Sequence, residues 1–342
     1  MAMAPLITVS IVTFNARDEI ERCLQCLSAQ SFDSFDIHIW DNASTDGTAE
    51  FLKAVSDPRI TLLCSENNVG FCTAHNRIIR ASGSEFVLVL NPDCYLERDY
   101  LEVAVKAVRE DPRIGAVAGK LYRLRTPEAG LAAARKDGVL DSTGTYFVPS
   151  FRHFDRGSNE VEGGRFSQEE WVFGVTGAAA FYRREMLEEI RIDEEYFDEA
   201  FFAYREDADL AWRMQSSGWR CLYTPQAVGY HVRKVLPAGR SRVAATLNMH
   251  SVKNRFLFRL NNVAWQTCVR FFLSMVFRDC AVIGYTILFE RSSLPGLGFV
   301  IRNFRGRWER RRKILEKRRV PFASLHRWIH WHPTAFSKDT SL

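Results

Sequence analysis

Apolar, β-branched stretches alternate with helical patterns along the first third of the chain. We predict strands over residues 8–14, 35–40, 60–64, 85–90 and 114–119, and helices over residues 18–30, 48–55, 73–81 and 100–108. Strands and helices in this alternation favour an α/β fold with a mostly parallel central sheet covered by helices. Ligands of such folds bind at the carboxyl ends of the strands, so we expect functional residues just after strands.

The pattern weakens in the middle of the chain and then returns. Residues 123–170 are rich in Gly, Ser and charge and predict loops and short hairpins. Beyond them we predict a small-residue strand over 173–182, helices over 184–190 and 206–217, and a strand over 219–224. Residues 242–259 and 263–289 have helical, aromatic and basic patterns, which indicates a separate helical extension.

Composition excludes two classes of protein. A chain of 342 residues that is 46% hydrophobic and 25% charged can bury a large core, so it is neither disordered nor a disulfide-stapled miniprotein. The eight cysteines are irregularly spaced, and the pair Cys23 and Cys26 has no second pair to complete a zinc site. We therefore expect reduced thiols and a cytoplasmic location.

The sequence shows neither a basic, apolar export signal at its start nor a long uncharged segment near its end. The longest uncharged stretches, such as residues 280–289, are much shorter than the ~20 apolar residues of a spanning helix. We therefore expect no membrane-spanning segment.

Charge is strongly segregated along the chain. Residues 1–229 contain 24 Lys and Arg against 36 Asp and Glu, whereas residues 230–342 contain 22 against 5. This asymmetry predicts an anionic partner, and amphipathic helices on the inner face of the cell membrane would supply one. A packed helical subdomain or a dimer interface is the alternative. Nucleic acid could use the same charges with Trp308, Trp328 and Trp331, but nothing upstream supports it, and we expect none.

Polar residues follow the first three predicted strands. Asp41 ends the second strand before a turn rich in Asn, Ser and Gly, where its carboxylate could accept hydrogen bonds from a base or ribose. An Asx turn with a helix cap at Ser44 or Asp46 explains the same residues. Gly70 could let the backbone approach a ligand closely, or could simply form a turn.

Asp93 follows the buried fourth strand, after Asn91 and Pro92. A carboxylate there could hold a divalent ion that neutralises a leaving diphosphate, although a capped turn is the alternative. Mg²⁺ or Mn²⁺ would need further ligands, and His231 after the last strand is the candidate.

Three carboxylates open the helix predicted over residues 206–217: those of Glu206, Asp207 and Asp209. The helix dipole alone favours acidic residues in a first turn. A carboxylate directed into a ligand cleft could instead remove the proton from an acceptor hydroxyl.

Together these segments resemble the family 2 glycosyltransferases, in particular their bacterial rhamnosyltransferase-like branch, across residues 8–235. The segments that carry the resemblance are TVSIVTFN, WDNASTDGT, NNVGFCTAHN, VLNPD, GVTGAAAFYRRE and FDEAFFAYREDADLAWRMQSSGWR, followed by YHVR. The resemblance implies a GT-A fold over residues 1–235, and the helical extension predicted above then covers residues 236–342. Residues 1–122 would bind a nucleotide sugar and residues 123–235 an acceptor.

The resemblance also implies roles for individual residues. Thr13, Asn15 and Asp41 would hold the nucleoside, with Asn68, Gly70 and Asn76 in the adjoining nucleotide-binding motif. Asp207 would be the general base, with Glu206 and Asp209 as alternatives, and Gly177, Ala178 and Asp209 would line the cavity for sugar and acceptor.

One position departs from the family pattern. Asp93 takes the place of the last Asp of the DxD motif, but Asn91 stands where the first Asp would be. Because this carboxylate is missing, a site for Mg²⁺ or Mn²⁺ would depend more strongly on His231 as a ligand. The implied function is an inverting transfer from a nucleoside-diphosphate sugar, with dTDP-rhamnose as the candidate donor, to a glycan or lipid-linked acceptor. A UDP-sugar donor, or a non-catalytic adaptor with the same fold, are the alternatives.

Overall fold

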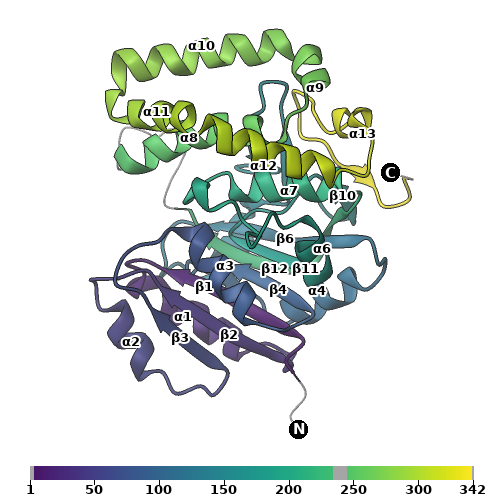
Figure 1. Ribbon diagram of the computed structural model, residues 1–342. Coiled ribbons are helices and arrows are strands. Elements are labelled where there is room, and N and C mark those ends of the chain that lie inside the picture. The colour runs from purple at the N-terminus through teal and green to yellow at the C-terminus, as the bar shows by residue number, and fades with distance from the viewer. Residues whose placement is uncertain (1–3, 234–244, 341–342) are drawn as a thin grey trace.

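The computed structural model describes residues 4–233 and 245–340 as an α/β unit topped by a layer of C-terminal helices (Figure 1). The strands are β1 (Ile7–Thr13), β2 (Phe35–Asp41), β3 (Ile60–Cys64), β4 (Phe86–Leu90), β5 (Cys94–Leu96), β6 (Ile114–Leu124), β7 (Leu140–Ser142), β8 (Thr145–Phe147), β9 (His153–Asp155), β10 (Glu170–Val172), β11 (Ala179–Arg183), β12 (Arg220–Val232) and β13 (Phe336–Ser337). The helices of the α/β unit are α1 (Arg17–Ser28), α2 (Thr48–Ala54), α3 (Phe71–Ala81), α4 (Tyr100–Val108), α5 (Leu131–Asp137), α6 (Arg184–Ile190), the 3₁₀ helix η1 (Glu199–Phe201) and α7 (Glu206–Ser216). The C-terminal layer contains α8 (Ala245–Asn262), α9 (Trp265–Arg270), α10 (Phe272–Phe289), the 3₁₀ helix η3 (Arg291–Ser293), α11 (Leu294–Arg302), α12 (Phe304–Glu316) and α13 (Phe322–His326).

The central sheet is mixed, and one reversed strand makes it so. Its order is β13-β10-β12-β6-β11-β4-β1-β2-β3. From β12 to β3, neighbouring strands run parallel except at β11, which is antiparallel to both β4 and β6. The α/β fold predicted from the alternation of strands and helices is confirmed, and β11 turns its amino end toward the edge where the other six strands end.

Both faces of the sheet are buried, which accounts for the nearly continuous apolar runs of its central strands. Every residue of β4 is buried, and so are all but one of the residues of β6. α3 packs on β1 and β2, while α4 packs on β6 and β12. Strands covered on both faces need no alternation of polar residues, as parallel sheets generally show.

The boundaries differ from the sequence prediction mainly in the second half. β12 is thirteen residues long, because its pairing with β6 passes a register shift between Tyr223 and Val228 and then continues. The predicted strand over 173–182 is shorter, and the helix predicted over 263–289 is divided into α9 and α10. The helix predicted over 242–259 corresponds to α8, although its first three residues lie outside the described part of the chain.

One helix of the C-terminal third, α10, is long and apolar enough to cross a membrane, by length and composition only. The uncharged stretches of the sequence do not single it out, because Arg278 and Asp279 interrupt it. Thr286 is the one buried residue of α10, so this helix is not the core helix of the extension. Trp328, considered above for stacking on nucleic acid, is buried against Phe173 and Phe336.

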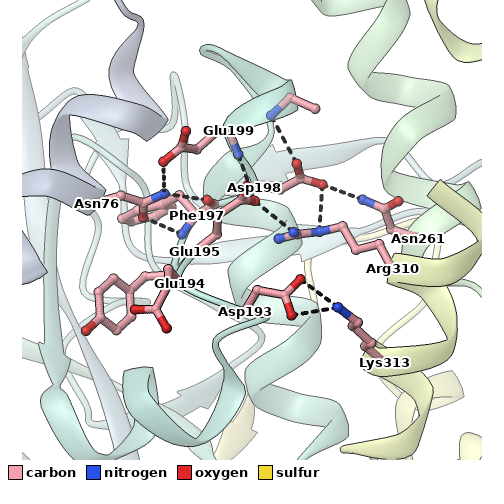
Figure 2. A network of polar contacts seen from close by, with 12 residues as sticks. Asn76, Asp193, Glu194, Glu195, Phe197, Asp198, Glu199, Asn261, Arg310 and Lys313 are labelled. Atoms are coloured by element: carbon pink, nitrogen blue, oxygen red, sulfur yellow. Dashed lines mark hydrogen bonds and ion pairs between the residues drawn. The ribbon is translucent and has the colours of Figure 1, made fainter. Parts of the chain in front are cut away.

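Buried ion pairs fasten the C-terminal layer to the α/β unit (Figure 2). Asp198, just before η1, accepts hydrogen bonds from Arg307 of α12 and from Asn261 of α8, at 2.7 to 2.8 Å, and forms an ion pair with Arg310 of α12 at 3.0 Å. Burial would raise the pKa of Asp198, but the two guanidinium groups hold it below its usual value. Lys313 reaches Asp193 in a second, exposed pair.

We expect Asp198→Ala to destabilise the protein by about 3–5 kcal/mol, because it leaves two guanidinium groups in a buried site without their carboxylate. Removing the exposed pair with Lys313→Ala should cost about 0–1 kcal/mol. Urea unfolding of both variants beside the wild type measures the difference. Equal, small losses would show that the Asp198 cluster does not hold the layers together.

Candidate active site

The predicted site residues gather at the edge of the sheet where β1, β2, β4, β6 and β12 end. Parallel register sets Thr13 beside Asp41 and aligns Ile11 with Leu90, so the residues that follow β1 and β4 emerge side by side. The amino end of the reversed strand β11 reaches the same edge through Ala179, which pairs with Leu90. Residues far apart in sequence therefore meet by strand order alone.

At the ends of β1 and β2, Asp41 organises a loop. Its carboxylate is buried and accepts from the Thr13 hydroxyl (2.8 Å) and from the Ser44 hydroxyl and backbone N–H (2.6 and 3.0 Å). Asn15, at φ 51°, accepts from the N–H of Thr45 (2.8 Å) and tethers the other side of the loop. The predicted nucleoside-binding residues thus form one hydrogen-bonded unit. The turn predicted as the alternative is also present, since Asp46 accepts from Thr48 before α2.

The Asn68 and Gly70 loop lies at the start of α3. Gly70 has φ 85°, and a Cβ there would meet the Phe202 ring at 2.5 Å, so only glycine fits. Asn68 accepts from the N–H of Gly70 (2.9 Å). Asn76 is fully buried and is bonded in both directions to the backbone of Phe197, so it braces the segment before η1 instead of facing a nucleotide.

Asp93 and His231, predicted as metal ligands, lie together. β5 pairs with β12 so that Cys94 faces His231, and the N–H of Val232 donates to the carbonyl of Asp93 (3.0 Å). His231 Nε2 is 3.4 Å from Asp93 Oδ1, and Nδ1 is 2.8 Å from Asp141 Oδ2. Burial opposes a charge on His231, but the two carboxylates raise its pKa to about 10.

These residues fit a divalent cation. Asp93 Oδ1 is buried and has no hydrogen-bond partner, and it faces an imidazole nitrogen. Asp141 holds the opposite ring nitrogen, as carboxylates commonly do behind metal-binding histidines. Within residues 4–233 and 245–340 no group of three or more His, Cys, Asp or Glu could hold a metal ion.

A short backbone path joins this pair to the acidic start of α7. The N–H of Asn91 donates to the carbonyl of Ala178 (2.9 Å), and the N–H of the neighbouring Gly177 donates to Asp207 Oδ2 (3.3 Å). A Cβ on Gly177 would lie 3.6 Å from the Glu206 carboxylate and 3.9 Å from Asp207. The Asp93 loop and the Asp207 carboxylate are therefore held in fixed relation by adjoining residues of one segment.

The three carboxylates of α7 have different environments. Asp207 is half-buried, and its Oδ1 accepts from the N–H of Ala208 (2.7 Å). Burial raises the pKa of Asp207, while burial and the Asp207 charge raise that of Glu206 to about 8. A half-buried Asp207 carboxylate whose pKa is raised is suited to accept a proton.

The structure corrects the assignment of Asp209 to the cavity for sugar and acceptor. Asp209 is fully buried, and its carboxylate pairs with Arg213 (2.8 Å) and Asn262 (2.7 Å). It links α7 to α8 and has no surface facing a ligand. For the same reason Asp209 is no longer an alternative to Asp207 as the general base.

Sequence reasoning missed a group of residues beside Asp207. His153 Nε2 lies 3.8 Å from Asp207 Oδ1, and its Nδ1 lies 3.5 Å from Arg205. Burial lowers the pKa of His153 to about 3, so it is neutral. Burial, and then the charges of Arg255 and Arg152, lower the pKa of Arg205 to about 9. His153 and Asp141 come from the weakly patterned stretch 123–170, where no sequence signal marks them.

Residues 8–191 match the family model described as glycosyl transferase family 2.

Curated relatives cover most of the chain. An N-acetylglucosaminyl-diphospho-decaprenol L-rhamnosyltransferase of Mycobacterium tuberculosis is 28% identical in an alignment that covers 79% of this chain and 90% of that protein. A poly-beta-1,6-N-acetyl-D-glucosamine synthase of Staphylococcus aureus is 23% identical over 65% of this chain and 48% of its own length.

Solved structures share the fold at low identity. Residues 1–349 of S. aureus TarS in complex with UDP-GlcNAc superpose with a TM-score of 0.57 at 15% identity, covering 91% of this chain and 90% of that one. GalNAc-T7 with UDP, GalNAc and Mn²⁺ gives 0.56 at 11% identity and covers 76% and 48%. The chain spans about half the length of the longer TarS chain, at 47%.

The raised pKa of Glu206 predicts a dependence of stability on pH. The folded state binds this proton more tightly than the unfolded chain, so Glu206 should lower stability, on the order of a few kcal/mol, as pH rises from about 4.3 to about 8. Glu206→Gln removes this loss, and its advantage over the wild type should grow between pH 5 and pH 8.5 in urea unfolding. The exposed Glu194→Gln is the control. A constant difference between Glu206→Gln and wild type would contradict the assignment.

Proposed function

The chain belongs to glycosyl transferase family 2 and is a nucleotide-sugar glycosyltransferase with a GT-A-like fold, and we propose that it inverts the anomeric carbon while transferring rhamnose to a lipid-linked acceptor. The observation that supports this most strongly is the backbone path from Asn91 through Ala178 and Gly177 to Asp207. This path holds Asp93 and His231, which would face the departing diphosphate, in a fixed position relative to Asp207. The Asp207 carboxylate would face the attacking hydroxyl.

Asp207 is the general base of the proposed reaction. The acceptor oxygen forms a bond to the anomeric carbon, its proton passes to Asp207, and the bond from that carbon to the diphosphate breaks. The bonding electron pair leaves with the nucleoside diphosphate. Each Asp207 oxygen accepts one backbone N–H, which leaves lone pairs for the proton. Protonated Glu206 keeps a second negative charge away from the incoming hydroxyl.

Asp93 and His231 would hold Mg²⁺ or Mn²⁺, which when bound supplies positive charge that offsets the charge developing on the diphosphate. Asp141 keeps the His231 ring in place through its 2.8 Å contact. Asp141 is itself held by Arg123 and Arg233, at 3.2 and 2.8 Å. Arg233 also pairs with Asp155 of β9, so this support is tied to the hairpin that contains His153.

The donor and acceptor are proposed from the curated relative and from local charge. The name of the Mycobacterium tuberculosis relative states transfer of L-rhamnose to a GlcNAc-diphospho-lipid, so we propose dTDP-rhamnose as donor and an acceptor of this kind. Arg205 lies next to Asp207 with the charges of Arg152 and Arg255 nearby, which suits an acceptor that carries a diphosphate. A UDP-sugar donor remains the second candidate, and competition between dTDP and UDP in a thermal-shift assay distinguishes the two.

We expect Asp207→Asn to reduce the rate of sugar transfer about a hundredfold or more, since the amide keeps the shape but cannot accept a proton. Donor binding, measured by calorimetry, should remain close to the wild-type value. Asp193→Asn, an exposed change at a distant turn, controls for the substitution itself. Undiminished turnover by Asp207→Asn would refute the assignment of the base.

Asp93→Ala should weaken nucleotide binding only when metal is present. Titration of dTDP and UDP with and without Mn²⁺ should show that the metal-dependent gain in affinity seen for the wild type is lost in the variant. The metal-free affinities should agree, because Asp93 is proposed to act through the ion. An equal Mn²⁺-dependent gain in both proteins would reject Asp93 as a ligand.

A further inference from the structure

α10 contacts the rest of the protein through one side. Met275, Asp279 and Thr286 lie on that side, spaced by four and seven residues as one helical face requires. Met275 packs against the core, Thr286 is buried, and Asp279 pairs with Arg255 (3.2 Å) and Arg259 of α8. Figure 1 shows α10 as the outermost helix, on the side of the molecule away from β1 to β3.

The opposite face of α10 is apolar and uncovered. We define the α10 stripe as Leu273, Val276, Phe277, Ile287 and Leu288, which fall within about a third of the helix circumference. Leu273 and Phe277 are 81% and 80% exposed, and Leu288 is 67% exposed. Trp265 and Val269 of α9 continue the apolar surface beyond its amino end. Soluble proteins rarely leave so many large apolar groups together in water.

Basic residues flank the stripe at both ends of α10. Exposed Arg270 precedes α10 and exposed Arg291 follows it. Residues 265–319, from α9 to just beyond α12, contain 13 Lys and Arg against 4 Asp and Glu. An apolar face between basic ends is the arrangement of helices that lie in the interface of an anionic bilayer.

We propose that the α10 stripe docks the protein in the plane of an anionic membrane surface, with Leu273, Phe277 and Leu288 inserted among the lipids and Arg270 and Arg291 at the headgroups. The proposal stands on this surface alone and does not depend on the sugar or acceptor proposed above. The membrane surface would be the anionic partner that the basic charge of the C-terminal third predicts.

The buried contacts of α10 favour docking in the plane over crossing the bilayer. Eighteen residues span about 27 Å, slightly less than a typical hydrocarbon core of about 30 Å. Asp279 lies near the middle of the helix and is paired with two arginines of α8. A spanning α10 would carry these charges to the centre of the membrane or separate them, and both are unfavourable.

Charge also favours a bilayer over a second copy of the chain. Two stripes packed together would bring two strongly basic helical layers into proximity, which like-charge repulsion opposes. Anionic headgroups complement the same charges.

Docking through α10 also suits a lipid-linked acceptor, because α10 is connected to the site. Arg255 pairs with Asp279 of α10 and donates to the carbonyl of Ser150, three residues before His153.

Co-sedimentation of the full chain with vesicles tests the docking surface. The wild type should bind vesicles of phosphatidylglycerol and phosphatidylcholine, and Leu273→Asp with Phe277→Asp should lower the partition coefficient about tenfold or more. Arg270→Glu with Arg291→Glu should weaken binding to these vesicles but not to phosphatidylcholine alone. Val161→Asp, at an apolar position that is 68% exposed and lies outside the C-terminal layer, should bind as the wild type does.

Four outcomes would overturn the proposal. If a monomeric wild type does not sediment with anionic vesicles, the protein does not bind such membranes. If the stripe variant binds as fully as the wild type, the α10 stripe is not the docking surface. A wild-type dimer that Phe277→Asp converts to a monomer makes the stripe a protein interface. Alkaline carbonate should release the membrane-bound protein, and retention in the membrane would mean that α10 spans it. Nucleotide binding by the stripe variant should equal that of the wild type, so these outcomes are independent of the catalytic proposal.

Discussion

The site depends on the reversed strand β11, which lies between β4 and β6. A parallel strand at this position would end at the edge, whereas β11 begins there, so the segment before it can contact the loop after β4. Two adjoining residues of that segment contact different parts of the site. The carbonyl of Ala178 accepts from the N–H of Asn91, and the N–H of Gly177 donates to the Asp207 carboxylate. The segment just before β11 therefore connects the backbone of the Asp93 loop to the Asp207 side chain through two hydrogen bonds.

A second constraint comes from the C-terminal layer. α12 and α8 bind Asp198 immediately before η1, and the residue after η1 is Phe202, whose ring excludes any side chain at Gly70. The carbonyl of Phe202 accepts from the N–H of Cys72 in the first turn of α3. The helical extension thereby supports the loop assigned to nucleotide binding. This connection gives the extension a structural role at the site in addition to the surface of α10.

Periodicity predicted most of the fold, because apolar stripes in strands and helices are set by burial alone. It placed α4, α6 and β3 correctly and located the edge that carries Asp41 and Asp93. It could not separate the three acidic residues of α7, since only packing decides that Asp209 turns inward to Arg213 while Asp207 faces outward. It also could not find His153, whose hairpin has no period, nor the reversal of β11, which depends on pairing between distant strands.

The central claim is that the ends of these strands bind one activated sugar through its nucleotide, diphosphate and attached metal. A crystal structure with dTDP and Mn²⁺ tests it most directly, because the anomalous signal of manganese locates the ion independently of the protein. We expect an anomalous peak in direct coordination with Asp93 and His231, the diphosphate on that ion, and the base beside Asp41. A manganese peak and nucleotide bound away from these residues would contradict the claim.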